Sequence, residues 1–211
     1  MKKLFSIFFV LVIMISVSAY AAAPELTDQQ KNELKQYGIM IGDEDGDLHL
    51  DDTITRAELA KVICVAGNLD EDKIEKKCTF SDVTADSWAY KYICIASENG
   101  IINGYEDGSF KPEDSVSNEE AVKMIVSLLG YGVEADTNGG YPAGYMAAAG
   151  WRGVITEKMS FGINTAAVRN DIGAMLCGAL DIPLMKEEDG MYVIMDGTMY
   201  PKETLRINLE K

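Results

Sequence analysis

The sequence predicts a mainly α-helical protein made of three similar helix-loop-helix units and a short β-rich C-terminal tail. Three observations predict this class: a segment that recurs along the chain, apolar residues at helical spacing in each copy, and helix-start signals at the same point of the copies. A unit of this length cannot bury its apolar face alone, so the units must stack on one another. The 211 residues leave room for one such array behind a targeting segment.

The N-terminal segment has the pattern of a signal peptide. Two lysines precede an apolar run from Leu4 to Val17, and small residues follow up to Ala23. An uncleaved membrane anchor is the alternative, but the run is shorter than the roughly 20 apolar residues that span a bilayer. We therefore predict a signal peptide over residues 1–23, an exported protein, and no membrane segment after cleavage.

The charge balance excludes one class of partner. The chain has 34 acidic and 19 basic residues and a formal charge of -15, and loss of the two N-terminal lysines would make this about -17. Such a charge repels the phosphate backbone of nucleic acids and anionic membrane surfaces, so neither is an expected partner. A composition of 47% hydrophobic and 25% charged residues is near the globular average, which predicts a folded core.

One segment of the chain recurs 62 residues later. Residues 38–48 and 100–110 share an opening Gly-Ile and a central Asp-Gly. The same offset places residues 54–58 on 116–120, and apolar residues follow both at the i, i+3, i+4, i+7 spacing of a helix. A third, more eroded copy has residues 167–171 at this point. The chain therefore contains an internal repeat.

The copies predict where the units begin and end. The first unit lacks its opening motif, because the offset of 62 places that motif inside the signal peptide. The third unit has lost the Asp-Gly loop and is degenerate. The predicted units are residues 24–70, 78–133 and 138–184, followed by a tail over residues 185–211.

Capping boxes mark the start of the second helix in two units. Thr55 with Glu58, and Ser117 with Glu120, have the spacing at which the hydroxyl accepts from the N3 amide and the carboxylate accepts from the N-cap amide. The third copy has Val168 at the cap position, so its helix start is expected to differ.

The second unit shows the complete pattern. A helix is predicted over residues 85–99, carrying Trp88, with Gly100 as its C-terminal cap. A turn follows at residues 105–110, and Pro112 prevents a helix until the next start signal.

The residue pattern of the tail differs from that of the three units. Apolar residues at 191–195, a turn at Asp196-Gly197 and the stretch 204–209 predict a β-hairpin or the start of a longer β-rich segment. This tail is a candidate contact for a surface-protein partner.

The four cysteines are Cys64, Cys78, Cys94 and Cys177. None has a Cys-x-x-Cys or Cys/His zinc spacing, so no metal is expected. A bridge from Cys64 to Cys78 across a polar loop is favoured, and buried free thiols are the alternative.

No catalytic arrangement is visible. The chain has one histidine, His49, and neither a Gly-x-Ser-x-Gly motif nor a Gly-rich phosphate loop, so no enzyme and no cofactor are predicted. Asp43, Asp45 and Asp47 resemble the start of a calcium loop, but Leu48 occupies the position of the required glycine. An EF-hand is therefore rejected, and looser calcium binding stays open.

Several motifs in fixed order resemble S-layer homology repeats. They are Phe80-Ser81-Asp82-Val83, Trp88-Ala89, the run from Gly100 to Pro112, and Ile54-Thr55-Arg56-Ala57-Glu58. The resemblance covers about residues 27–184. It implies three repeats in a pseudo-threefold spindle around a central helical bundle. It also implies non-covalent attachment to secondary cell-wall polysaccharide, often pyruvylated, in grooves at the surface of a bacterium, mostly a Gram-positive one.

An arginine at a helix start predicts an anion site. Arg56 follows the N-cap Thr55, where the helix macrodipole disfavours a cation. Free helix amides together with a guanidinium would suit a carboxylate such as a pyruvate ketal. Arg169 holds the same place in the third copy, whereas the second has Asn118. Thr55 and Glu58 would hold the helix start, as would Glu120 in the second unit.

The family resemblance adds further contact candidates. Trp88 could stack on a sugar ring, and its counterpart in the third unit is Tyr141. Asp82 and Gly104 belong to the same surroundings in the family. The clipped first unit leaves at most two well-formed grooves.

The predicted function is non-covalent anchoring at the cell wall through binding of its polysaccharide. The alternative is a degenerate scaffold that acts in protein interaction or self-assembly without binding glycan. Missing motifs in the first and second units favour the alternative.

Overall fold

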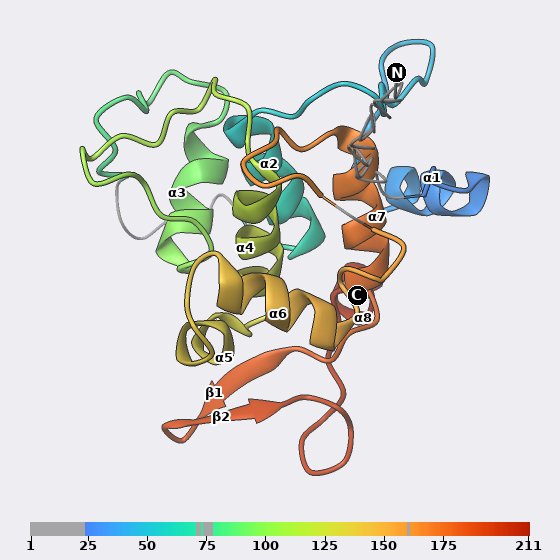
Figure 1. Cartoon of the computed structure of the whole chain (residues 1–211), viewed down its shortest axis with the longest axis vertical. Coiled ribbons are helices and arrows are strands. Elements are labelled where there is room, and N and C mark those ends of the chain that lie inside the picture. The colour runs from blue at the N-terminus through green and yellow to red at the C-terminus, as the bar shows by residue number, and fades with distance from the viewer. Residues whose placement is uncertain (1–23, 71–72, 74–77, 160) are drawn as a thin grey trace, which may run out of the picture.

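The computed structural model describes residues 24–70, 73, 78–159 and 161–211, so the predicted signal peptide lies outside it. The mainly α-helical class is confirmed. None of the helices in this described part is both long and apolar enough to cross a bilayer. The elements, shown in Figure 1, are α1 (Asp28–Gln36), α2 (Arg56–Ala66), α3 (Tyr90–Glu98), α4 (Asn118–Leu128), α5 (Gly132–Thr137), α6 (Ala143–Arg152), α7 (Arg169–Ala179), β1 (Met185–Glu188), β2 (Met191–Ile194) and α8 (Leu205–Leu209).

Helices α2, α4 and α7 follow the three repeated helix-start motifs and lie in the middle of the molecule (Figure 1). Each has 11 residues, most of them buried. Helix α3 packs on α2, α6 packs on α4, and the N-terminal helix α1 packs on α7, the last of the three. The first helix therefore covers the last of the three central helices.

A ring of backbone hydrogen bonds joins the three segments that precede these helices. The Ile54 amide donates to the Ala167 carbonyl (3.2 Å), Ala167 donates to Val116 (2.9 Å), and Val116 donates back to Ile54 (3.1 Å). All three residues are fully buried. Each pre-helix segment thus pairs with both of the others, which explains why isolated bridges occur here without a regular sheet.

Both predicted capping boxes are present. The Thr55 side chain accepts from the Glu58 amide, and Ser117 accepts from the Glu120 amide. Val168 gives α7 no side-chain cap, as expected. The Arg169 amide at the start of α7 donates to the Asp52 carbonyl, as the Arg56 amide of α2 does to the Asp114 carbonyl.

The predicted helix over residues 85–99 is too long. Helix α3 begins at Tyr90, and two turns precede it, in which Ser87 donates to Thr84 and Tyr90 to Ser87. Serine and threonine favour such local turns over a helix interior. Trp88 therefore lies in a turn outside the helix. The predicted end is confirmed, because Gly100 has φ +68°, which a glycine adopts readily.

The tail forms a hairpin in which the predicted strand at 191–195 is confirmed as β2, but its partner strand and turn precede it instead of following it. Strands β1 and β2 pair antiparallel through a turn at Asp189-Gly190, and both turn residues have positive φ, as a type I′ turn requires. The predicted turn at Asp196-Gly197 exists without joining strands. The stretch predicted as a second strand is helix α8, capped by Thr204.

Arg206 of α8 fastens the tail to the rest of the chain. Its guanidinium donates to Asp181 just after α7 and to Glu33 of α1. Tyr37, at the end of α1, donates to Glu210 (2.9 Å). The tail therefore stabilises the junction between the first and last units, and a partner for it stays a prediction.

The favoured Cys64 to Cys78 bridge is wrong for this structure, in which all four cysteines are free thiols. The Cys64 thiol lies buried between α2 and α3 and donates to the Tyr92 carbonyl (3.3 Å).

We predict that Val116→Pro destabilises the fold more than Val116→Ala does. Both variants lose the apolar side chain, but only proline removes the amide and leaves the buried Ile54 carbonyl unpaired. The additional loss should be about 1–3 kcal/mol in the free energy of unfolding, measured by urea denaturation. Equal losses would show that the ring contributes nothing.

Candidate functional site

Two hollows of about 240 Å³ each lie beside the central helices. We call them groove A and groove B. Groove A is lined by Arg56, residues 101–105, Glu120, Lys123, Met124 and Tyr141. Groove B is lined by residues 38–41, Glu58, Lys61, Val62, Trp88 and Arg169.

The two grooves are copies of one design. Residues 39–41, Glu58 and Lys61 of groove B stand 62 positions before their counterparts in groove A. Each groove adds an arginine from the start of another central helix and an aromatic side chain from the following unit. These are Arg56 and Tyr141 in groove A, and Arg169 and Trp88 in groove B. Each groove is therefore assembled from three separate parts of the chain.

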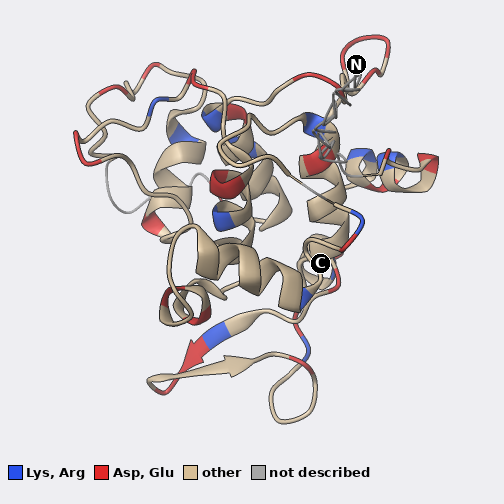
Figure 2. Cartoon of the chain, in the orientation of Figure 1, with Lys and Arg blue, Asp and Glu red and all other residues tan. Residues whose placement is uncertain are grey.

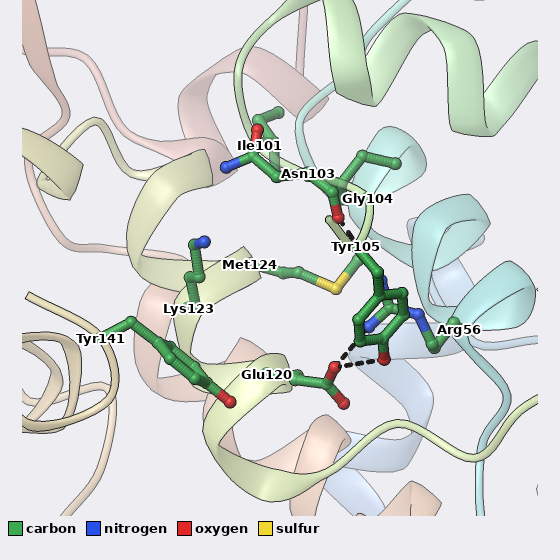
Figure 3. Close-up of a pocket in the computed structure, with 10 residues that line it drawn as sticks. Arg56, Ile101, Asn103, Gly104, Tyr105, Glu120, Lys123, Met124 and Tyr141 are labelled. Atoms are coloured by element: carbon green, nitrogen blue, oxygen red, sulfur yellow. Dashed lines mark hydrogen bonds and ion pairs between the residues drawn. The ribbon is translucent and has the colours of Figure 1, made fainter. Parts of the chain in front are cut away.

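In groove A the charge of Arg56 is already neutralised. Its side chain is almost completely buried between the rings of Tyr105 and Phe110, at 4.8 and 4.6 Å from their centroids. Nε donates to the Phe110 carbonyl at 2.7 Å. A terminal nitrogen donates to Glu120 Oε1, also at 2.7 Å (Figure 3). Burial and the bond to Glu120 raise the pKa of Tyr105 to about 12, so its hydroxyl stays protonated and donates to Glu120.

The amides at the start of α2 are not free. The Arg56 amide donates to the Asp114 carbonyl and the Ala57 amide to the Pro112 carbonyl, both at 2.9 Å. The predicted anion site on free helix amides is therefore wrong here, because the neighbouring unit already satisfies them. Thr55 lines neither groove and holds the helix start.

Arg169 of groove B is in a different state. Its Nε donates to the Leu48 carbonyl at 2.8 Å, the position equivalent to Phe110 in groove A. Among the described residues no carboxylate forms an ion pair with it. Glu58 lines the same groove, but its carboxylate accepts from the Thr55 amide. The positive charge of Arg169 is therefore available to a ligand.

Each groove also holds a lysine that the sequence interpretation missed. Lys61 lies over the Tyr92 ring at 5.9 Å, and Lys123 lies between Tyr141 and Tyr145 at 5.5 and 5.7 Å. Within the described part of the chain neither lysine has a carboxylate partner. Their identical position in the repeat was the signal that could have identified them.

The remaining predicted residues are divided between the grooves or lie outside them. Trp88 lines groove B with 56% of its surface exposed, while Gly104 lines groove A. Asp82 lines neither, since its two oxygens accept from the Phe110 and Lys111 amides at 2.8 Å. The structure therefore gives Asp82 a role in holding the loop.

The start of the remaining central helix, α4, lacks the arginine that the other two have, and α7 lacks the lysine. Asn118 stands where the other units have arginine, and it is buried and donates to Thr165. In the repeat alignment Ala174 takes the place of Lys123. Figure 2 shows acidic residues spread over the loops and helix ends of this acidic protein.

Comparison with known families gives an independent result. Residues 79–122 match the S-layer homology domain. The chain carries an S-layer homology domain. This segment includes the loop of groove A and the turn that carries Trp88.

Relatives of this S-layer homology protein are surface proteins. It is 33% identical over 175 residues to the "Middle cell wall protein" of Brevibacillus brevis, which covers 81% of this chain and 16% of the relative. It is 31% identical over 190 residues to the "Surface layer protein" of Brevibacillus choshinensis, covering 84% and 16%. A third relative, the "Cellulosome-anchoring protein" of Acetivibrio thermocellus, is 35% identical over 85 residues, covering 38% and 19%.

The chain thus spans about a sixth of the length of the first two relatives. The predicted location at the bacterial cell surface is confirmed by this group of relatives.

We predict that Arg56→Ala lowers the free energy of unfolding by about 3 kcal/mol, because it leaves a carboxylate and a carbonyl without their buried donor. Arg169→Ala should cost about 1 kcal/mol, since it loses one hydrogen bond at a half-buried site. Urea denaturation of both variants measures the difference. Equal losses would contradict the distinct states of the two arginines.

A second prediction concerns Gly104. A Cβ there would lie 2.5 Å from a Phe80 ring carbon and from the Ser109 carbonyl, so Gly104→Ala should destabilise by about 1–3 kcal/mol. The matched control is Gly150→Ala in α6, where a Cβ meets nothing within 4 Å and the helix gains about 0.5–1 kcal/mol. Thermal unfolding should shift in opposite directions. A shift in the same direction would rule out the close approach of Phe80.

Proposed function

We propose that the protein anchors itself non-covalently at the cell wall by binding an acidic secondary cell-wall polysaccharide, with pyruvate ketals as the acidic groups. The observation that carries this proposal is the pair of matched grooves. Each combines a lysine that has no carboxylate partner in the described chain with an aromatic side chain, on a protein of formal charge -15. An acidic protein that attracts an anionic glycan needs such local positive charge.

Groove B has the more complete chemistry. A ketal carboxylate would accept from Lys61 and from the guanidinium of Arg169, and charge-assisted hydrogen bonds of this kind are the stronger ones. The exposed Trp88 indole offers a flat apolar face on which a sugar ring can stack.

Groove A would bind through Lys123 and Tyr141, with less help from its arginine. Arg56 is held by Glu120, so a ligand carboxylate would compete with a partner at 2.7 Å. The proposal therefore assigns groove B the larger share of affinity. Gly104 would let the glycan approach the backbone of groove A.

The proposed arrangement is a pseudo-threefold spindle of three S-layer homology repeats, over residues 24–70, 78–133 and 138–184. The ring through Ile54, Val116 and Ala167 would mark its axis, with α2, α4 and α7 as the central bundle. The cyclic packing of α1 on α7 supports this arrangement, and the grooves lie between successive units.

The relatives support binding as the function. The proposal assigns no reaction to either groove. Their names describe wall, surface-layer and anchoring proteins, and all of them are longer than this chain. The alternative, a scaffold that no longer binds glycan, makes the opposite prediction in the following experiment.

The test is sedimentation of the protein with purified peptidoglycan that carries its polysaccharide. Lys61→Ala, Arg169→Ala and Trp88→Ala should each weaken binding about tenfold or more, the scale of a lost charge-assisted hydrogen bond or stacking contact. Lys73→Ala is the matched control, because this lysine is exposed, lines neither groove and forms an ion pair with Asp70.

Binding that disappears when the polysaccharide is stripped supports anchoring. Equal sedimentation with stripped and intact wall would contradict it and favour the scaffold. If the three groove B variants bind as well as the Lys73 control, the glycan does not occupy groove B.

A further inference from the structure

Three side chains meet at the N-terminal half of α3, away from the lysines of the grooves. The Cys78 and Cys94 thiols lie within hydrogen-bonding reach of each other. Both cysteines act on the Tyr90 hydroxyl, whose pKa is raised by burial and by these interactions. The two cysteines are 16 positions apart, so the chain between them forms a closed loop.

The surroundings allow few roles for this pair. Cys94 is 2% exposed on α3, and Cys78 is half-buried. A metal site needs more ligands, and no cluster of three or more His, Cys, Asp or Glu suited to a metal occurs among the described residues. Two adjacent thiols on a protein of the cell surface commonly oxidise to a disulfide, because the environment outside the cell favours disulfides.

We infer that Cys78 and Cys94 form a disulfide bond in the exported protein. The two thiols already interact in the reduced structure, and a disulfide requires them to approach to about 2 Å. Cys64 takes no part, because its thiol donates to the Tyr92 carbonyl.

The oxidant is a disulfide of an exported thiol-disulfide oxidoreductase. One cysteine, as thiolate, attacks that disulfide and forms a mixed disulfide, and the second cysteine displaces the oxidoreductase as a thiolate. The two cysteines together lose two protons and two electrons, and the oxidoreductase leaves as a dithiol. Burial raises the pKa of the Cys78 thiol in the folded chain, so the exchange is expected during folding, before the pair is covered.

The bond would brace the wall of groove B. The loop that it closes carries Trp88, which lines groove B, and Asp82, which holds the Phe110 and Lys111 amides. If groove B binds glycan as proposed above, reduction should weaken wall binding. This last consequence rests on the proposed function, whereas formation of the bond does not.

The experiment is a peptide map of the full chain, exported from its host and alkylated under denaturing, non-reducing conditions. Trypsin cleaves after Lys91, between the two cysteines, so the bond would join two peptides. We expect alkylation at Cys64 and Cys177 and a linked pair containing Cys78 and Cys94. Alkylation of all four cysteines, or a link that includes Cys64, would overturn the inference.

Thermal unfolding provides a second measurement. Reduction should lower the melting temperature of the wild-type chain by about 6–12 °C, the effect expected of a loop of this size. Cys64→Ser should show the same shift on reduction, and Cys94→Ser should show none. A shift that persists in Cys94→Ser would also overturn the inference. Wall sedimentation of the oxidised and reduced chains then tests the link to groove B separately.

Discussion

The fold depends on three backbone hydrogen bonds that close a ring among Ile54, Val116 and Ala167. Each bond joins a different pair of units, so no unit can leave without breaking two of them. The groups are fully buried, and an unpaired carbonyl there would cost about 1–3 kcal/mol. The ring thus couples residues more than 100 positions apart and fixes the relative orientation of α2, α4 and α7.

The grooves follow from this coupling. Each groove takes its arginine from one unit, its lysine from a second and its aromatic side chain from a third. The three backbone hydrogen bonds hold these units in position relative to one another. The same geometry explains why the grooves differ. Tyr105 and Phe110 enclose Arg56, whereas the equivalent positions beside Arg169 are Asp43 and Leu48. The two aromatic rings hold Arg56 in a structural role, whereas Arg169 lacks them and remains available to a ligand.

The features that could be predicted from the sequence are those set by residues close together in the chain. The helix starts at Thr55 and Ser117 follow from hydroxyl and carboxylate spacing within four residues, and both were confirmed. The predictions failed where a contact between residues far apart in the chain determines the structure. The pairing of Arg56 with Glu120 spans 64 positions, and nothing local indicates it. The hairpin turn was misplaced because Asp-Gly pairs flank the predicted strand on both sides, and the hairpin forms through the first of them. The lysines of the two grooves were missed.

The central claim is that two grooves bind the acidic glycan independently. Calorimetric titration with purified, pyruvylated wall-polysaccharide fragments tests it most directly. The account predicts two sites in the wild-type chain, one site in each of Lys61→Ala and Lys123→Ala, and none in the double variant. Undiminished binding by a folded double variant, or a single site in the wild type that survives either substitution, would contradict it.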